Sequence, residues 1–109
     1  MNGQDFRDQE PVWVKYLTYV GGNSNKFYEC RVDMGDDGLF YVTKRWGRRP
    51  DDGGGQTKVE SSTSMSYAMG VADGMVAEKV RKGYLFAERP ARADSRVQRI
   101  RTFGDNDDE

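Results

Sequence analysis

The chain has 109 residues, and with 36% hydrophobic and 12% aromatic residues it has enough apolar material for one modest core and too little for two domains. Its 17 basic and 18 acidic residues give a net charge of -1. The chain as a whole therefore lacks the excess of basic residues that is usual in a nucleic-acid-binding protein, and its charge has to be judged locally. The single cysteine and the lack of histidine exclude an internal disulfide and a zinc site built from the usual ligands, and we expect no cofactor.

The N-terminal segment, residues 1–11, carries one arginine and three acidic residues. A signal peptide would be basic and then apolar, and no apolar run in the chain approaches the length that spans a bilayer. We therefore predict a flexible N-terminus over residues 1–11 and a cytoplasmic protein.

Two strands open the predicted domain. Residues 12–20 are rich in β-branched and aromatic side chains and stop at a glycine-rich turn, which is typical of a strand. Residues 26–33 alternate between apolar and polar side chains, so they predict the next strand, and the glycines and aspartates of residues 34–38 predict a turn. Because Cys30 lies in the middle of that strand, we expect a buried and unreactive thiol.

Two further strands flank a loop. Residues 39–46 alternate in the same way and place Trp46 on the same face as Phe40. Residues 49–55 contain one proline and three consecutive glycines, so they predict a loop, and residues 56–60 predict a short fourth strand.

From Ser64 onward the apolar residues follow the period of a helix. Thr63 or Ser64 can act as the N-cap, and Gly83 marks the end. Gly70 and Gly74 lie on the outer side and each cost about 1 kcal/mol relative to alanine, so this helix depends on packing. The stripe that we expect to pack on the sheet consists of Met65, Ala68, Met69, Ala72, Met75, Val76 and Val80.

These elements predict an α+β fold, a small antiparallel sheet of about four strands with one long α-helix packed on one face. The domain is expected to span residues 12–89. The apolar pattern fades after Tyr84, and residues 90–109 combine four arginines with five acidic residues. This composition predicts a disordered charged tail.

Four short segments of the chain fit one known pattern. They are Asn25-Lys26-Phe27-Tyr28, Arg45-Trp46-Gly47-Arg48, Gly55-Gln56-Thr57-Lys58 and Lys79-Val80-Arg81-Lys82-Gly83-Tyr84. In this order, and over roughly residues 12–86, they resemble the WGR domain, the small nucleic-acid-binding module of DNA-damage-activated poly(ADP-ribose) polymerases and of many short bacterial proteins. The resemblance implies a WGR-like fold and a role in DNA repair or regulation.

The chemistry of these segments suits a nucleic-acid backbone, because phosphates accept hydrogen bonds from guanidinium, ammonium, amide and hydroxyl groups. Asn25, Lys26, Arg48 and Tyr84 carry such donors. The resemblance implies that they hold the DNA backbone, including the 5'-phosphate at a strand break, and that Trp46 packs against the sugar there. The complete predicted nucleic-acid-binding set is Asn25, Lys26, Trp46, Gly47, Arg48, Gln56, Lys58 and Tyr84.

Each of these residues also has a purely structural interpretation. A tryptophan in an alternating strand usually buries its ring, so Trp46 alone favours a core position. Lys26 and Arg48 alone would be solvated charges, Tyr84 would seal the end of the helix, and Gln56 would stabilise the junction of strand and loop. Their occurrence together is what favours the binding surface.

Gly47 and the loop after it bear on the predicted binding surface in opposite ways. Gly47 is expected to let the backbone approach a ligand, because a β-carbon there would hold the ligand off. The loop that follows is longer and more acidic than the family pattern, and Asp51 and Asp52 would repel DNA if they lay near the phosphate site.

Catalysis is not expected. The chain has no histidine to act as a base near neutral pH, and glycines 53–55 lack the following lysine-serine pair of a nucleotide-binding loop. We predict a non-catalytic monomer that binds DNA. The alternative is an adaptor that keeps the fold and binds a basic protein partner through its acidic loop and tail. Salt-dependent retention on DNA separates these two functions.

Overall fold

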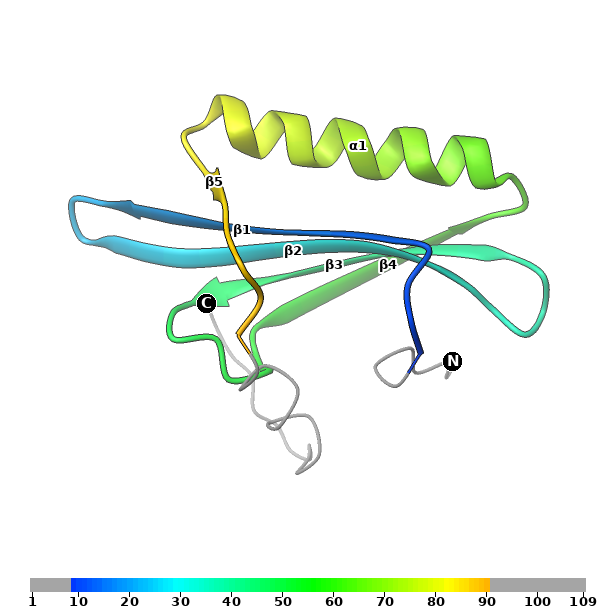
Figure 1. Ribbon diagram of the computed structural model, residues 1–109, viewed down its shortest axis with the longest axis horizontal. Helices are drawn as coiled ribbons and strands as arrows, with labels where there is room; N and C mark the ends of the chain where they lie inside the picture. Colours follow the sequence, from blue (N-terminus) through cyan, green and yellow to red (C-terminus); the bar gives the residue numbers. More distant parts are fainter. Residues whose placement is uncertain (1–8, 91–109) are drawn as a thin grey trace.

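The computed structural model describes residues 9–90 of the chain. They form a five-stranded antiparallel sheet, with the strand order β4-β3-β2-β1-β5, and one helix that runs across one face (Figure 1). The elements in chain order are β1 (Trp13–Gly21), β2 (Ser24–Met34), β3 (Phe40–Arg48), β4 (Gln56–Ser62), α1 (Met65–Arg81) and β5 (Leu85–Phe86). The predicted α+β class is confirmed, and the sheet has one strand more than the four expected.

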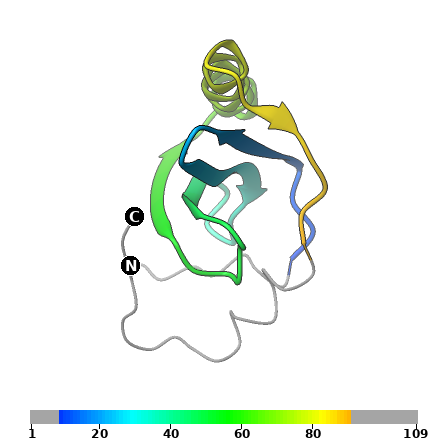
Figure 2. The ribbon, with the colours of Figure 1, turned by 90° about the vertical axis from the view of Figure 1, so that its left-hand side faces the viewer.

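The additional strand is β5, which pairs with the outer edge of β1. It has only two residues, Leu85, which pairs with Thr18, and Phe86, which pairs with Leu17. So short a segment shows no alternation, which explains why the sequence pattern does not reveal it. Seen from the end, the sheet curls away from α1, with β4 and β5 at its opposite edges (Figure 2).

The helix starts and stops where its capping residues predict. The Ser64 side chain accepts a hydrogen bond from the backbone N–H of Tyr67, which satisfies one of the free donors of the first turn. At the other end Gly83 takes a φ of +105°, a conformation that favours glycine, and the backbone N–H of Tyr84 donates to the carbonyl of Lys79. This turn directs Tyr84 back toward the sheet.

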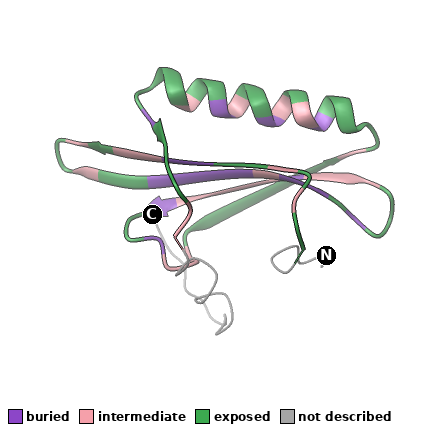
Figure 3. Ribbon diagram, viewed as in Figure 1, coloured by how far each residue is buried: buried purple, intermediate pink, exposed green. Residues whose placement is uncertain are grey.

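The core between helix and sheet is built from alternate residues of β1, β2 and β3. The buried residues of α1 are Ala68, Ala72 and Val76, the centre of the predicted stripe (Figure 3). The ends of that stripe, Met65 and Val80, are 47% and 42% exposed, so the prediction that they pack on the sheet is wrong. A twisted sheet stays close to a straight helix only near its middle. On the sheet side this core contains Leu17, Tyr28, Cys30, Val32 and Val42.

The opposite face of the sheet is also partly buried, because the chain covers it with the loop of residues 49–55 and with Arg89. Its buried members are Tyr16, Phe27, Glu29, Asp33 and Asp51. Three of these are acidic, so this second layer is held by ion pairs as much as by apolar contact.

The segments next to the domain are described only in part. Gln9, in the segment predicted to be flexible, donates from its side-chain amide to Asp33 and to the carbonyl of Met34. The predicted tail, residues 90–109, lies outside the described residues except for Pro90. Within the described part of the chain, α1 is the one helix, and it is neither long nor apolar enough to cross a membrane.

Candidate nucleic-acid interface

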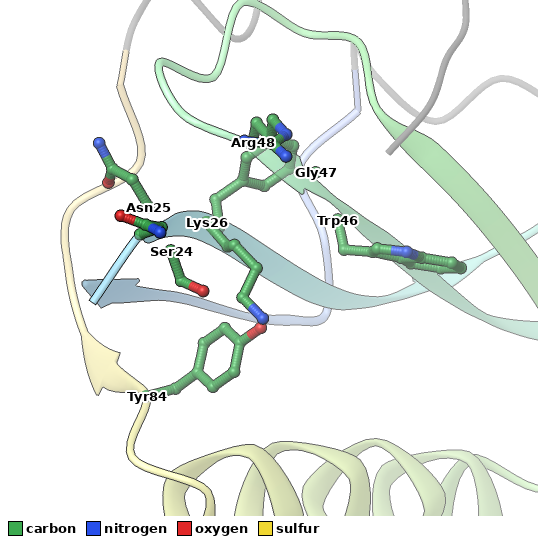
Figure 4. Close-up of a pocket in the computed structure, with 9 residues that line it drawn as sticks. Ser24, Asn25, Lys26, Trp46, Gly47, Arg48 and Tyr84 are labelled. Atoms are coloured by element: carbon green, nitrogen blue, oxygen red, sulfur yellow. The ribbon is translucent and has the colours of Figure 1, made fainter. Parts of the chain in front are cut away.

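An open hollow of about 160 Å³ lies at the end of the sheet where β2 begins and β3 ends (Figure 4). This volume is below the roughly 300–1,000 Å³ of pockets that enclose drug-sized ligands, and it suits a phosphate or a sugar that continues into solvent. The residues that line it are Asn23, Ser24, Asn25, Lys26, Phe27, Trp46, Gly47, Arg48 and Tyr84.

Six of the eight sequence-predicted residues therefore meet in one place. The antiparallel register of β2 and β3 brings them together, since it pairs Lys26 with Arg48 and Tyr28 with Trp46. Side chains paired across a ladder project to the same face, so Lys26, Arg48 and Trp46 all lie on the face that carries α1. Tyr84 reaches the same place from the turn that follows the helix (Figure 4).

Tyr84 is the buried centre of the cationic part of the site and is 9% exposed. Its ring centroid is 6.0 Å from the Lys26 ammonium nitrogen and 5.6 Å from that of Lys79. Lys26 also lies 5.3 Å from the ring of Tyr19, and Lys79 lies 4.9 Å from the ring of Tyr28. Cation–π contacts hold ammonium groups in place and leave their N–H donors free for an anion.

Lys79 is the functional candidate that the sequence prediction missed. It belongs to the closing motif and does not line the hollow, but its ammonium group lies over the rings of Tyr28 and of Tyr84, which does line it. Burial lowers the pKa of Lys79, and the positive charges of Lys82 and Lys26 lower the pKa further. A phosphate bound here would relieve this crowding of like charges.

Four basic side chains at this end of the sheet have no acidic partner in the part of the chain that the structure describes. Among residues 9–90, no carboxylate forms an ion pair with Lys26, Arg48, Lys58 or Lys79. Lys44 and Lys82, by contrast, are each 3.8 Å from a glutamate. Four unpaired cations on one face produce a local positive potential in a chain whose net charge is -1.

Gln56 and Lys58 lie beside the hollow and do not line it. They are exposed residues of the edge strand β4, where Gln56 pairs with Trp46 and Lys58 pairs with Lys44. Both project to the face of α1 and extend the donor surface from Trp46 along β4. Trp46 itself is half-buried, since it packs against the core and also lines the hollow. The core and ligand interpretations of this residue are therefore compatible.

The structure gives a further reason for a glycine at position 47. Gly47 is buried, and a β-carbon there would lie 3.2 Å from both the Cα of Gly55 and the ring of Phe27. That β-carbon would project to the face opposite α1 and would press against the returning loop. Packing of the loop therefore accounts for the glycine, and the closer approach of a ligand at Gly47, which lines the hollow, stays a prediction.

The condition under which Asp51 would repel DNA, a position near the phosphate site, is not met. Its side chain is fully buried on the face opposite α1 and forms an ion pair with Arg45 at 2.7 Å. Burial acts to raise the pKa of Asp51, but the hydrogen bonds and charge of Arg45 outweigh burial, and the pKa is lowered. Asp52 accepts a hydrogen bond from the backbone N–H of Gly54 within the loop. The acidic loop is thus folded under the sheet.

Features that would indicate catalysis or metal binding are not found in the described part of the chain. Cys30 is buried as predicted, and burial raises the pKa of its thiol to about 12, so the thiol stays protonated near neutral pH. Within residues 9–90 no cluster of three or more cysteine, aspartate and glutamate side chains is arranged to hold a metal ion.

Comparison with known proteins agrees with this geometry. The family model described as the WGR domain matches residues 13–92, which is most of the chain. Searches of the curated proteins and of the solved structures each found no significant match. The WGR domain is a nucleic-acid-binding module and not a catalytic domain. Because this family model covers most of its length, the chain belongs to the WGR domain family.

Proposed function

We propose that the hollow binds the sugar-phosphate backbone of DNA, preferentially at a 5'-phosphorylated break, and that the protein acts as a monomeric cytoplasmic binding module without catalysis. The observation that carries this proposal is the group of unpaired cations around Tyr84. A buried tyrosine with two ammonium groups near its ring forms an anion receptor, since neither lysine has a carboxylate partner among the described residues.

Each donor group in or beside the hollow has a chemical role in this proposal. Lys26 and Lys79 neutralise the terminal phosphate, with the Tyr84 hydroxyl as a further donor. Arg48 lies beside Lys26 in the ladder and takes the next phosphate along the strand. The exposed part of the Trp46 ring packs against the sugar between them. Gln56 and Lys58 on β4 then contact the backbone beyond the break.

The adaptor alternative has lost part of its basis. Its acidic loop would have to present carboxylates to a basic partner, and the Asp51 side chain is fully buried against Arg45. The acidic tail lies outside the described residues. No described contact favours a protein partner over DNA.

The test compares three duplexes of the same sequence in a gel-shift series: intact, nicked without a 5'-phosphate, and nicked with one. We expect the affinity to rise in that order. Lys26→Ala should remove the preference for the phosphorylated nick, because it removes one side of the anion receptor. Lys15→Ala is the matched control, since Lys15 is an exposed lysine of β1 that lies outside the hollow.

The outcomes are distinct. Equal affinity for all three duplexes would contradict a site for a terminal phosphate. If the wild-type protein is not retained on any duplex at low salt, the nucleic-acid function is wrong, and a basic protein partner becomes the next candidate to test.

A further inference from the structure

We infer that Asp51 and Arg45 position the Gly47–Arg48 backbone and the Arg48 side chain for phosphate binding. This inference rests on the proposed function. Neither residue lines the hollow, and both lie on the face of the sheet opposite α1. Arg45 belongs to β3 and Asp51 to the loop directly after it. We call this pair the Asp51–Arg45 lock.

Every oxygen of the Asp51 carboxylate is engaged. The Nη1 and Nη2 atoms of Arg45 donate to Oδ1 and Oδ2 over 2.7 and 2.8 Å. The Tyr16 hydroxyl donates to Oδ2 over 2.8 Å, and the backbone N–H of Gly53 donates to Oδ1 over 3.0 Å. A fully buried carboxylate with these four donors joins β1, β3 and the loop in one network.

Arg45 anchors the other side of the lock. Its Nε and Nη2 atoms donate to Oε1 of Glu29 on β2 over 3.1 and 3.0 Å, and its Nη1 atom also donates to the carbonyl of Gly54. The guanidinium lies 4.7 Å from the centroid of the Phe27 ring. Arg89 pairs with the second oxygen of Glu29. The loop is therefore tied to the sheet through its residues 51 and 54.

The loop in turn sets the wall of the hollow. Directly after Arg48, the backbone N–H of Arg49 donates to the Asn25 carbonyl over 2.9 Å, and its side chain donates to the Asn25 amide oxygen over 3.0 Å. The loop returns with Gly55 packed on Gly47. Asn25 and Gly47 both line the hollow, so the chain is held on either side of Arg48, by Arg49 at Asn25 and by the returning loop at Gly47, and the lock holds that loop on the sheet.

Arg48 has no ion pair of its own among residues 9–90, so no partner side chain directs its guanidinium group. The direction of its side chain follows from the backbone that carries it. Releasing the loop would let the end of β3 move and would spread Arg48 over many orientations, so that it no longer meets a phosphate at low entropic cost.

This role predicts the opposite sign from simple charge repulsion. If Asp51 acted only as a negative charge near DNA, replacing it by asparagine would tighten binding. If it positions Arg48, the same replacement weakens binding, although the protein gains positive charge.

The experiment compares Asp51→Asn with Asp33→Asn in the full-length chain. Asp33 is also a fully buried aspartate in an ion pair with an arginine, at 2.8 Å to Arg31. It lies seven residues along β2 from Lys26, roughly 23 Å at 3.3 Å per residue. Both variants keep the side-chain shape and remove one negative charge. Affinity for the 5'-phosphorylated nick is measured over a range of salt concentrations, with thermal melting of each variant as the stability readout.

We expect Asp51→Asn to weaken binding about tenfold and to lower the log-log salt slope by about one unit, because Arg48 no longer neutralises its phosphate. Asp33→Asn should lose comparable stability and keep the wild-type slope. A loss of stability alone cannot change the slope of the folded protein, so the slope separates positioning from folding.

Three results would overturn the inference while the proposed function stands: tighter binding by Asp51→Asn, unchanged binding, or the same loss in Asp33→Asn. If Asp51→Asn does not fold, Tyr16→Phe replaces it, since this variant removes one hydrogen bond to Asp51 and keeps the ring 6.0 Å from that of Phe27. An affinity reduced about twofold to threefold is expected there, and an unchanged affinity overturns the inference. Failure of the proposed function itself shows differently, as absent binding by the wild-type protein.

Discussion

Tyr84 has two roles at the end of α1. Its backbone N–H closes the last turn by donating to the Lys79 carbonyl, and its ring packs at 5.4 Å from that of Tyr19. The same ring lies near the ammonium groups of Lys26 and Lys79. Each such contact is worth about 0.5–1 kcal/mol at an exposed site. The ring therefore keeps both ammonium groups nearby while the two lysine side chains retain most of their mobility. The helix end and the binding site therefore depend on the same residue.

Asp51 predicts a specific pH dependence of stability. Its pKa is lowered in the folded protein, so its contribution to stability is fully present above the unfolded value of about 3.9 and is lost as pH falls through the folded pKa. Removing one partner of a buried ion pair costs on the order of 3 kcal/mol. We therefore expect the melting temperature of Asp51→Asn to lie below that of the wild type at pH 7. The two melting temperatures should converge as the pH falls well below 4, because both side chains are then uncharged.

Melting curves from pH 7 down to pH 2 test this expectation. A gap between wild type and variant that stays constant over the whole range would show that the charge of Asp51 does not contribute. The gap would then come from the exchange of a carboxyl oxygen for an amide NH2 group, which cannot accept the hydrogen bonds that Asp51 accepts.

At the scale of elements, the helix illustrates what periodicity can predict. Its cap at Ser64, its end at Gly83 and the burial of Ala72 all follow from residue type and spacing. The two-residue strand β5 does not follow, because it is too short to show a period and forms only where the chain returns alongside β1. Its existence depends on tertiary contacts that local patterns do not encode.

Some residues of the candidate site could likewise be predicted from the sequence, and others could not. Lys26, Trp46 and Arg48 are predictable, because two alternating strands joined by a short turn bring their motifs into register. Lys79 and the buried Asp51 are not. The position of Lys79 depends on how α1 lies over the sheet. Asp51 pairs with Arg45 on the face of β3 opposite α1, and the acidic composition of the loop does not indicate this partner.

The helix also supplies a test by substitution. Ala72 is fully buried, so Ala72→Asp should unfold the domain, because it places an unpaired charge in the core. A β-carbon at Gly74 would meet nothing within 4 Å, so Gly74→Ala should raise the stability by up to about 1 kcal/mol. Thermal melting followed by circular dichroism measures both effects.

Gly83→Ala is the matched control for the glycine substitution. Its φ of +105° is a conformation that alanine rarely adopts, and the added β-carbon would lie 3.1 Å from the Tyr19 ring. We expect it to destabilise the protein. If Gly83→Ala stabilises as much as Gly74→Ala, the helix does not end as described, and the placement of Tyr84 is wrong.

At the scale of the whole molecule, binding to a polyanion has to be reconciled with a net charge of -1. The charges are sorted between the two faces of the sheet. Glu29, Asp33 and Asp51 are buried on one face and paired with arginines, so they contribute little field outside. The cations that have no acidic partner among residues 9–90 lie on the side of α1, in or beside the hollow. The local potential, rather than the total charge, decides whether phosphate binds.

Salt dependence of binding to a nicked duplex with a 5'-phosphate tests this account most directly. Each phosphate neutralised by a lysine or arginine contributes about 0.9 units to the log-log slope. We predict that Lys26→Ala and Arg48→Ala each lower the slope by about one unit, while Trp46→Phe reduces affinity at an unchanged slope. Lys15→Ala should leave both quantities at the wild-type values, because Lys15 lies outside the hollow. A wild-type slope that none of the substitutions at the hollow alters would contradict the account, because the phosphates would then be bound elsewhere on the protein.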